Sequence, residues 1–147
     1  MRDGALTHHG SVPCNLEERS PVSLRLLLTL SGSLEALVGI LTLLSPTTAV
    51  TILFGGTVDP MTSVVTRLFG AGAFSLGLGC LKARDAAATS AGLAVSLGMT
   101  SYNVLAAMLI IWAAAGLGLG GLLLWGTGIA HAVLGMLFVS SLMALKR

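Results

Sequence analysis

The sequence predicts an all-α fold, a four-helix transmembrane bundle with both ends of the chain on the cytosolic side. Composition is the first reason, since 54% of the 147 residues are hydrophobic and 10% are charged, against about 25% charged in soluble domains. The mean hydropathy is +0.93. A chain this short cannot bury so much apolar surface in its own core, so lipid must cover the surplus.

Four long apolar stretches are the second reason, because each is near the ~20 residues that a helix needs to cross the hydrocarbon layer. We expect the spans at residues 22–44, 60–81, 86–115 and 122–145, all within one membrane domain over residues 21–147, after a mobile cytosolic tail over residues 1–20. The third span exceeds the length of a perpendicular helix, so tilt or a kink must absorb the excess.

The break after the first span predicts a short extra helix. Ser45-Pro46 combines a capping serine with a proline at the first helical position, which favours a helix start. We therefore expect residues 47–54 to form a short helix at the outer interface, stopped by Gly55-Gly56. The β-branched residues in this stretch also fit a strand-like arm, but an unpaired strand is costly at a membrane, so we prefer the helix.

The other span boundaries carry similar signals. Asp59-Pro60 repeats the cap-plus-proline pattern at the start of the second span. Asp85, in the charged turn after the second span, is expected to cap the third span. The glycine-rich run at residues 116–121 separates the third and fourth spans.

Loop charges are the third reason, and they give the orientation. With four spans, the tail, the middle turn and the C-terminus share one side of the membrane. Six of the eight basic residues fall there, namely Arg2, Arg19, Lys82, Arg84, Lys146 and Arg147. The other two loops carry no Lys or Arg. Because positive loops stay in the cytosol, we expect an integral, multi-pass protein with both termini cytosolic.

Charge and cysteine content exclude several classes of function. A net charge of +2 provides no general basic field for nucleic acid. The two cysteines, Cys14 and Cys80, form neither a disulfide framework nor a metal-binding pattern. We expect no metal site and no cofactor.

Each predicted span nevertheless carries a strongly polar residue within the hydrocarbon layer. By the helical rise of ~1.5 Å per residue, Glu35, Arg67, Asn103 and His131 lie ~10–14 Å below the outer ends of their spans. Tyr102 is the neighbour of Asn103. Ionisable groups are expensive inside a span and usually have a role.

Small residues share helix faces with these polar residues. Glu35 lies on one face with Gly32 and Gly39, and His131 lies on one face with Gly128 and Gly135. Small residues mark the faces where membrane helices approach closely. We therefore expect the polar residues to meet in a central cluster. In this cluster Glu35 and Arg67 form an ion pair, and Asn103 and His131 complete the hydrogen bonding.

The cluster admits three functions, and whether the protein is an enzyme stays open. A small scaffold or accessory subunit, bound to a membrane-protein partner or to further copies of itself, needs the cluster only to lock the helices. An intramembrane enzyme or binder would place a lipophilic small molecule against it. Glu35 and His131 would then be catalytic in a proton-transfer isomerase or cyclase, and Arg67, Tyr102 and Asn103 would bind. A transporter or channel subunit is the third function.

Three short motifs stand in the first half of the chain, namely Leu43-Leu44-Ser45-Pro46, Phe54-Gly55-Gly56 and Val65-Thr66-Arg67-Leu68-Phe69-Gly70. They resemble motifs of the DoxX-like small four-helix membrane proteins, including a related bacterial and fungal family of unknown function. The resemblance in sequence covers residues 22–84. The second half of the chain matches only in its number of helices. It implies a four-helix bundle in a membrane and no particular reaction. Some relatives are described as subunits of membrane oxidoreductases, but this sequence has no ligand set for quinone, haem or flavin.

Overall fold

The computed structural model describes residues 22–145, and this part of the chain is all-helical, as predicted. The helices are α1 (Leu24–Leu44), α2 (Pro46–Phe54), α3 (Pro60–Ala83), the short 3-10 helix η1 (Arg84–Ala86), α4 (Ser90–Gly116) and α5 (Leu124–Ala144). Four of them are long and apolar enough to cross a membrane, which indicates an integral multi-pass membrane protein. The tail predicted over residues 1–20 lies outside the described residues.

The predicted helix starts are confirmed at two positions and corrected at a third. The Asp59 carboxylate accepts a hydrogen bond from the backbone nitrogen of Thr62 at 2.7 Å and caps α3, and α2 forms as a helix directly after Ser45. Asp85, however, does not cap the third span. Its carboxylate pairs with two arginines instead, the chain makes another turn, and Thr89 caps α4.

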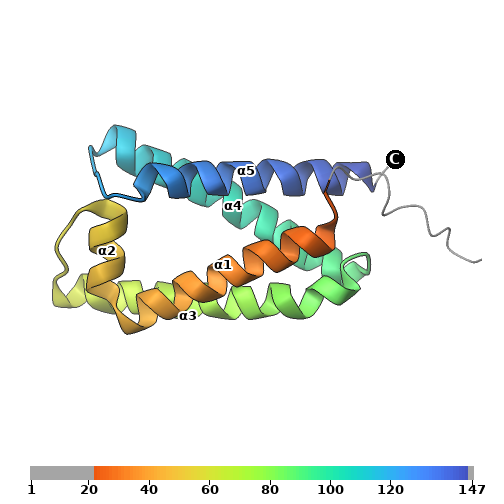
Figure 1. Ribbon diagram of the computed structural model, residues 1–147, viewed down its shortest axis with the longest axis horizontal. Coiled ribbons are helices and arrows are strands. Elements are labelled where there is room, and N and C mark those ends of the chain that lie inside the picture. Colours follow the sequence, from red (N-terminus) through yellow and green to blue (C-terminus); the bar gives the residue numbers. More distant parts are fainter. Residues whose placement is uncertain (1–21, 146–147) are drawn as a thin grey trace, which may run out of the picture.

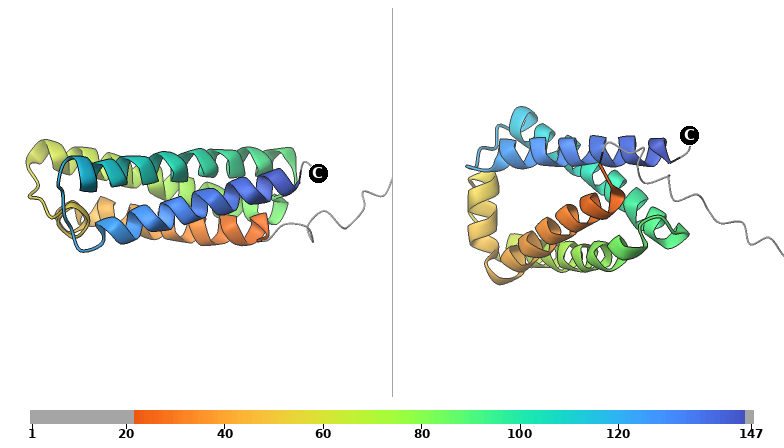
Figure 2. Two further views of the ribbon diagram at one scale, coloured as in Figure 1. Left: turned by 90° about the horizontal axis from the view of Figure 1, so that it is seen from above. Right: turned by 45° about the vertical axis from the view of Figure 1, so that its right-hand side comes forward.

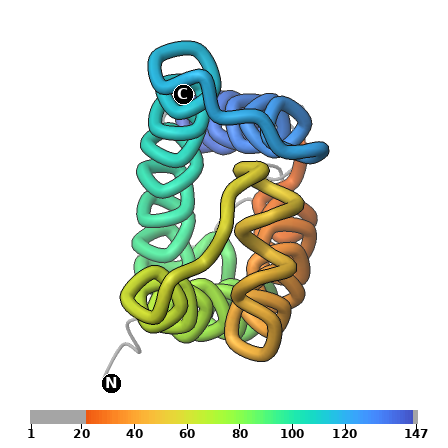
Figure 3. Tube along the Cα trace, turned by 90° about the vertical axis from the view of Figure 1, so that its left-hand side faces the viewer, coloured from red at the N-terminus to blue at the C-terminus, as the bar shows by residue number. Residues whose placement is uncertain are grey.

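The four long helices form two antiparallel pairs, α1 with α3 and α4 with α5 (Figure 1). The pairs meet at the end that holds η1, here called the basic end, and they diverge toward the end that holds α2, here called the α2 end (Figure 2). Seen from the α2 end, the four long helices form the sides of a frame. Helix α2 lies along the side formed by α1 and reaches toward α5, and the loop that follows α2 crosses the frame (Figure 3).

The hydrophobic core lies where the pairs meet. It draws on all four long helices through Leu24, Leu27, Leu28, Cys80, Met99 and Phe138, all of which are buried. The first three belong to the start of α1 and the last to the second half of α5, so this core belongs to the basic end. Apolar packing therefore joins the pairs at one end of the molecule.

Helix α2 makes the main link at the other end. Gly55 ends α2 in the left-handed conformation, with φ 72°, which glycine adopts without steric cost. The backbone nitrogen of Leu123, just before α5, donates to the carbonyl of Ile52 at 3.2 Å. Helix α2 thus runs from the end of α1 to the start of α5 and closes the frame.

Both ends of the described chain lie together. The Ser141 hydroxyl on α5 donates to the carbonyl of Val22, just before α1, at 2.9 Å. An even number of crossings requires this arrangement. That the basic end faces the cytosol stays a prediction.

Candidate functional site

A buried carboxyl group joins the two helix pairs. Glu35 on α1 is only 6% exposed. Its Oε2 accepts a hydrogen bond from the hydroxyl of Tyr102 on α4 at 3.1 Å. Since the pairs diverge beyond the core, this bond ties them together near the middle of the bundle. The expected partner of Glu35 was Arg67, and a contact between Glu35 and Tyr102 was not predicted.

A second polar contact continues the cluster within the α4–α5 pair. The ring of Tyr102 packs edge-on against the ring of His131, with centroids 5.6 Å apart and an angle of 83° between the planes. His131 Nδ1 lies 2.9 Å from Oδ1 of the buried Asn103. The cluster therefore runs from Glu35 through Tyr102 to His131 and Asn103 across three helices.

The backbone defines the orientation of the Asn103 amide and hence of the imidazole. The Asn103 side-chain nitrogen donates to the carbonyl of Met99 at 2.8 Å, so its oxygen is the atom that faces His131. An amide oxygen only accepts hydrogen bonds, so Nδ1 of His131 must carry the hydrogen. In the neutral ring this leaves Nε2 with a free lone pair, which is the form of a base.

Arg67 does not belong to the cluster, and the predicted ion pair with Glu35 is wrong. Arg67 is exposed, and its guanidinium donates to the carbonyl of Leu43 at the end of α1. Within residues 22–145, the ion pairs join Arg25 and Arg84 to Asp85 at the basic end. The buried carboxyl of Glu35 consequently has no cationic partner in this part of the chain.

The register of α1 against α3 explains the separation. Glycines bring the two backbones into contact, and a Cβ at Gly77 would lie 2.6 Å from the backbone nitrogen of Ala36. Glu35 is therefore nearly level with Gly77, whereas Gly70 already packs against Leu43, eight residues further along α1. The Arg67 backbone lies beyond Leu43 in this antiparallel register, and its side chain reaches back to the Leu43 carbonyl. At the helical rise the backbones of Glu35 and Arg67 are therefore more than about 12 Å apart in level.

A buried serine hydroxyl lies near the Glu35 carboxyl group on α1. Ser31 lies one turn before Glu35 on α1, is 1% exposed, and has no hydrogen-bond partner for its hydroxyl within the described residues. A buried hydroxyl without a partner costs about 1–3 kcal/mol. Sequence reasoning missed Ser31, because a serine in a span more often bonds its own helix backbone, as Thr29 and Thr42 do on α1.

Burial along one stripe of α1 changes abruptly next to Glu35. Residues spaced three and four apart share a helix face, and the exposed fractions along this face are 0% at Leu27, 1% at Ser31, 49% at Leu34, 43% at Val38 and 42% at Leu41. The face is therefore covered by protein toward the basic end and uncovered toward the α2 end. Glu35 lies at the boundary.

The chemistry available here is that of proton exchange. A carboxyl, a phenol and an imidazole follow one another within contact distance. No group of three or more metal-ligating side chains occurs within the described residues.

In comparisons with known proteins, no protein-family model, no curated protein and no solved structure matches the chain. The resemblance to the DoxX-like proteins therefore stays a hypothesis drawn from three short motifs.

Proposed function

We propose that this protein binds a lipophilic small molecule within the membrane and exchanges a proton with it at the cluster of Glu35, Tyr102 and His131. The observation that carries the proposal is the Glu35 carboxyl, which is buried inside a span beside one neutral hydrogen-bond donor and no cation of the described residues.

The cost of burial is the first argument. An uncompensated carboxylate costs several kcal/mol to bury, and an ionisable group in a span is expected to have a functional reason. If the cluster only locked the helices, a neutral amide at position 35 would serve as well. A carboxyl group at this position instead suits the holding of a proton or the binding of a donor group on a ligand.

Access is the second argument. The face of α1 beyond Glu35 is uncovered at Leu34, Val38 and Leu41, all of which are apolar. A lipophilic molecule arriving from the hydrocarbon layer would meet these side chains first and then the polar group at their end. This order fits a ligand with an apolar body and one hydrogen-bonding head.

The roles of the residues follow from their atoms. Glu35 is the proton donor or acceptor nearest the uncovered face, and Tyr102 lies between it and His131. With its hydrogen on Nδ1, the neutral imidazole offers Nε2 as the base. If the ligand reacts, isomerisation or cyclisation by proton transfer is the chemistry that an acid and a base in a dry site can perform.

Labelling with dicyclohexylcarbodiimide tests the proposal, because this lipophilic reagent adds to protonated carboxyl groups inside membranes. We expect the reagent to modify Glu35 of the protein in lipid nanodiscs, as peptide mapping by mass spectrometry would show. A water-soluble carbodiimide with an added amine should modify exposed Asp59 and Asp85 and leave Glu35 unmodified.

Two variants sharpen this labelling experiment. Glu35→Gln should lose the lipophilic label, and Tyr102→Phe, which removes the hydrogen bond to the carboxyl, should react faster than the wild type. If folded wild-type protein shows no label at Glu35 with either reagent, the carboxyl is sealed within the bundle. The cluster then only holds the helices together.

An accessory subunit remains the second candidate, on the evidence of one helix face. Gly72 and Gly79 on α3 have open space where a side chain would be, unlike Gly70 and Gly77, which contact α1. A second membrane helix could approach α3 there. A stable partner, or a second copy, recovered with the protein in mild detergent and lost in Gly72→Leu would support this candidate.

A further inference from the structure

A separate polar site lies at the basic end, where Arg25 precedes Glu35 on α1 by ten residues, or about 15 Å at the helical rise. A cavity of about 290 Å³ opens between the start of α1, the η1 turn, the start of α4 and the end of α5. This volume is close to the lower limit for ligand pockets, about 300 Å³. Its wall at residues 86–88 consists of three alanines, so no long side chain from this stretch fills it.

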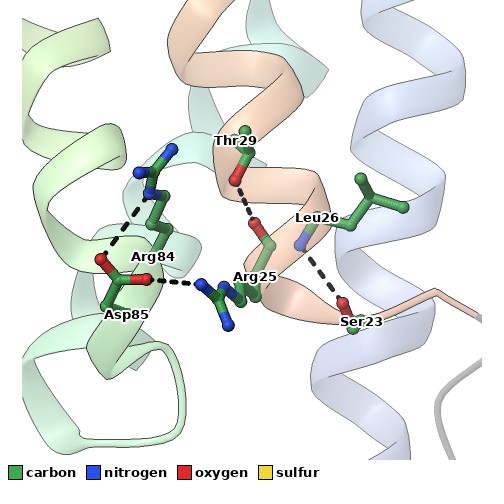
Figure 4. A network of polar contacts seen from close by, with 6 residues as sticks. All are labelled: Ser23, Arg25, Leu26, Thr29, Arg84 and Asp85. Atoms are coloured by element: carbon green, nitrogen blue, oxygen red, sulfur yellow. Dashed lines mark hydrogen bonds and ion pairs between the residues drawn. The ribbon is translucent and has the colours of Figure 1, made fainter.

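Two arginines and one carboxylate line the cavity. Figure 4 shows the Asp85 carboxylate joined to a terminal nitrogen of Arg25 on α1 and to the Nε of Arg84 on η1. Arg25 Nη2 lies 3.0 Å from one carboxylate oxygen, and Arg84 Nε lies 3.7 Å from the other. One negative charge thus faces two positive ones, which leaves the lining with a charge of +1.

The hydrogen bonding of Arg84 is also incomplete. Its Nε is buried and makes no hydrogen bond within the described residues, because 3.7 Å to Asp85 is beyond hydrogen-bonding distance. A guanidinium carries five donors in a planar fork that matches the oxygens of a phosphate group. The site therefore has surplus positive charge beside an open cavity.

The position of the site within the membrane favours a lipid as the source of the phosphate. Helix α1 has 21 residues and spans about 31 Å at the helical rise, which is the thickness of the hydrocarbon layer. Arg25, the second residue of α1, therefore lies at the level of the lipid headgroups. Leu24 and Leu145 also line the cavity and provide apolar contact for the glycerol and first methylene groups.

We propose that the cavity at the basic end binds the phosphate of an anionic phospholipid between Arg25 and Arg84. The lipid would balance the excess positive charge of the lining. It would also brace the turn between α3 and α4 against the start of α1. This site does not depend on the proposed function at Glu35.

Native mass spectrometry of the detergent-released protein, with phosphatidylglycerol and phosphatidylcholine added in equal amounts, tests the proposal. The wild type should retain phosphatidylglycerol in preference. A basic residue contributes about 1 kcal/mol to the binding of anionic lipid, so Arg84→Gln and Arg25→Gln should each weaken this retention about fivefold. Arg67→Gln, which removes the same charge at the other end of the bundle, is the matched control and should leave it unchanged.

A variant that should raise lipid retention distinguishes loss of the binding site from misfolding, because a misfolded protein would not bind more lipid. Asp85→Asn removes the anion that competes for both arginines, so it should raise the retention of phosphatidylglycerol above that of the wild type. The proposal is overturned if Arg84→Gln and Arg67→Gln retain equal amounts of this lipid, or if Asp85→Asn lowers retention. It is also overturned if millimolar inorganic phosphate displaces the lipid, since the ligand would then be a soluble anion.

Discussion

At the scale of single residues, the hydrogen bond between Tyr102 and Glu35 connects the two helix pairs. It joins two helix pairs whose buried apolar core lies at the basic end, and it does so through a buried carboxyl group. Polar contacts between membrane helices are often worth only ~0.6–2 kcal/mol. Here that amount acts at the point where the bundle begins to open.

Tyr102→Phe should therefore lower the free energy of unfolding by ~0.6–2 kcal/mol, as expected for one interhelical hydrogen bond. The ring and its contact with His131 are kept, so only the hydroxyl is tested. Unfolding in mixed detergent, followed by circular dichroism, measures the change. Ser101→Ala is the control, because the exposed Ser101 bonds only to its own helix. Equal stability of the two variants would show that the hydrogen bond between Tyr102 and Glu35 does not contribute to the free energy of unfolding.

A second residue-scale prediction concerns the cap of α3. Hydrogen bonding from the backbone of Thr62 lowers the pKa of Asp59 below its ordinary value. The charged cap therefore stabilises the fold fully above the ordinary pKa of an aspartate, and this stabilisation is lost as the pH falls through the lowered pKa. Asp59→Asn keeps a capping side chain without the titration.

The pH profile of unfolding distinguishes the two cap variants. The wild type should lose stability in acid relative to Asp59→Asn, and the difference between the two proteins should shrink as the pH falls. Parallel profiles down to strong acid would mean that the Asp59 charge contributes nothing to folding.

At the scale of elements, glycine positions decide how closely helices approach. The α1–α3 contact depends on Gly32, Gly39, Gly70 and Gly77, where an added Cβ would meet backbone or nearby side-chain atoms of the partner helix within 3.0 Å. Two residues beyond Gly77 on the same helix, Gly79 faces open space. The two positions share a helix and differ in their surroundings.

Gly77→Ala and Gly79→Ala form a matched pair for this contact. Alanine favours a helix over glycine by roughly 0.5–1 kcal/mol, so Gly79→Ala should be neutral or stabilising. Gly77→Ala should instead destabilise by about 1–3 kcal/mol, because the methyl group forces two backbones apart. Unfolding in detergent compares them directly, and similar stabilities would rule out the close approach of α1 and α3.

At the scale of the whole molecule, the sequence predicted the helices well and their arrangement only in part. Length and hydropathy are local properties, so the four spans and the extra helix α2 followed from them. Helical spacing also placed Glu35, Arg67, Asn103 and His131 on packing faces. The structure brings Glu35, Asn103 and His131 into one cluster, together with Tyr102.

Arg67 shows what the sequence could not predict. Counting residues from the span ends assumed that all helices end at one level. The α1 helix instead ends level with the third turn of α3, where Gly70 packs against Leu43, and α2 follows directly. Relative level depends on long-range packing of glycines, which no local pattern records. The divergence of the two helix pairs also depends on long-range packing, so the sequence did not predict it either.

The stripe of α1 that carries Ser31 and Val38 is covered by protein toward the basic end and uncovered toward the α2 end, and it changes from one to the other next to Glu35. The oxygen accessibility of spin labels tests this difference, using Ser31→Cys and Val38→Cys in a chain whose own Cys14 and Cys80 are replaced. We predict a label at position 31 that is shielded and a label at position 38 that is open to oxygen dissolved in the lipid. Two equally shielded labels would contradict the claim.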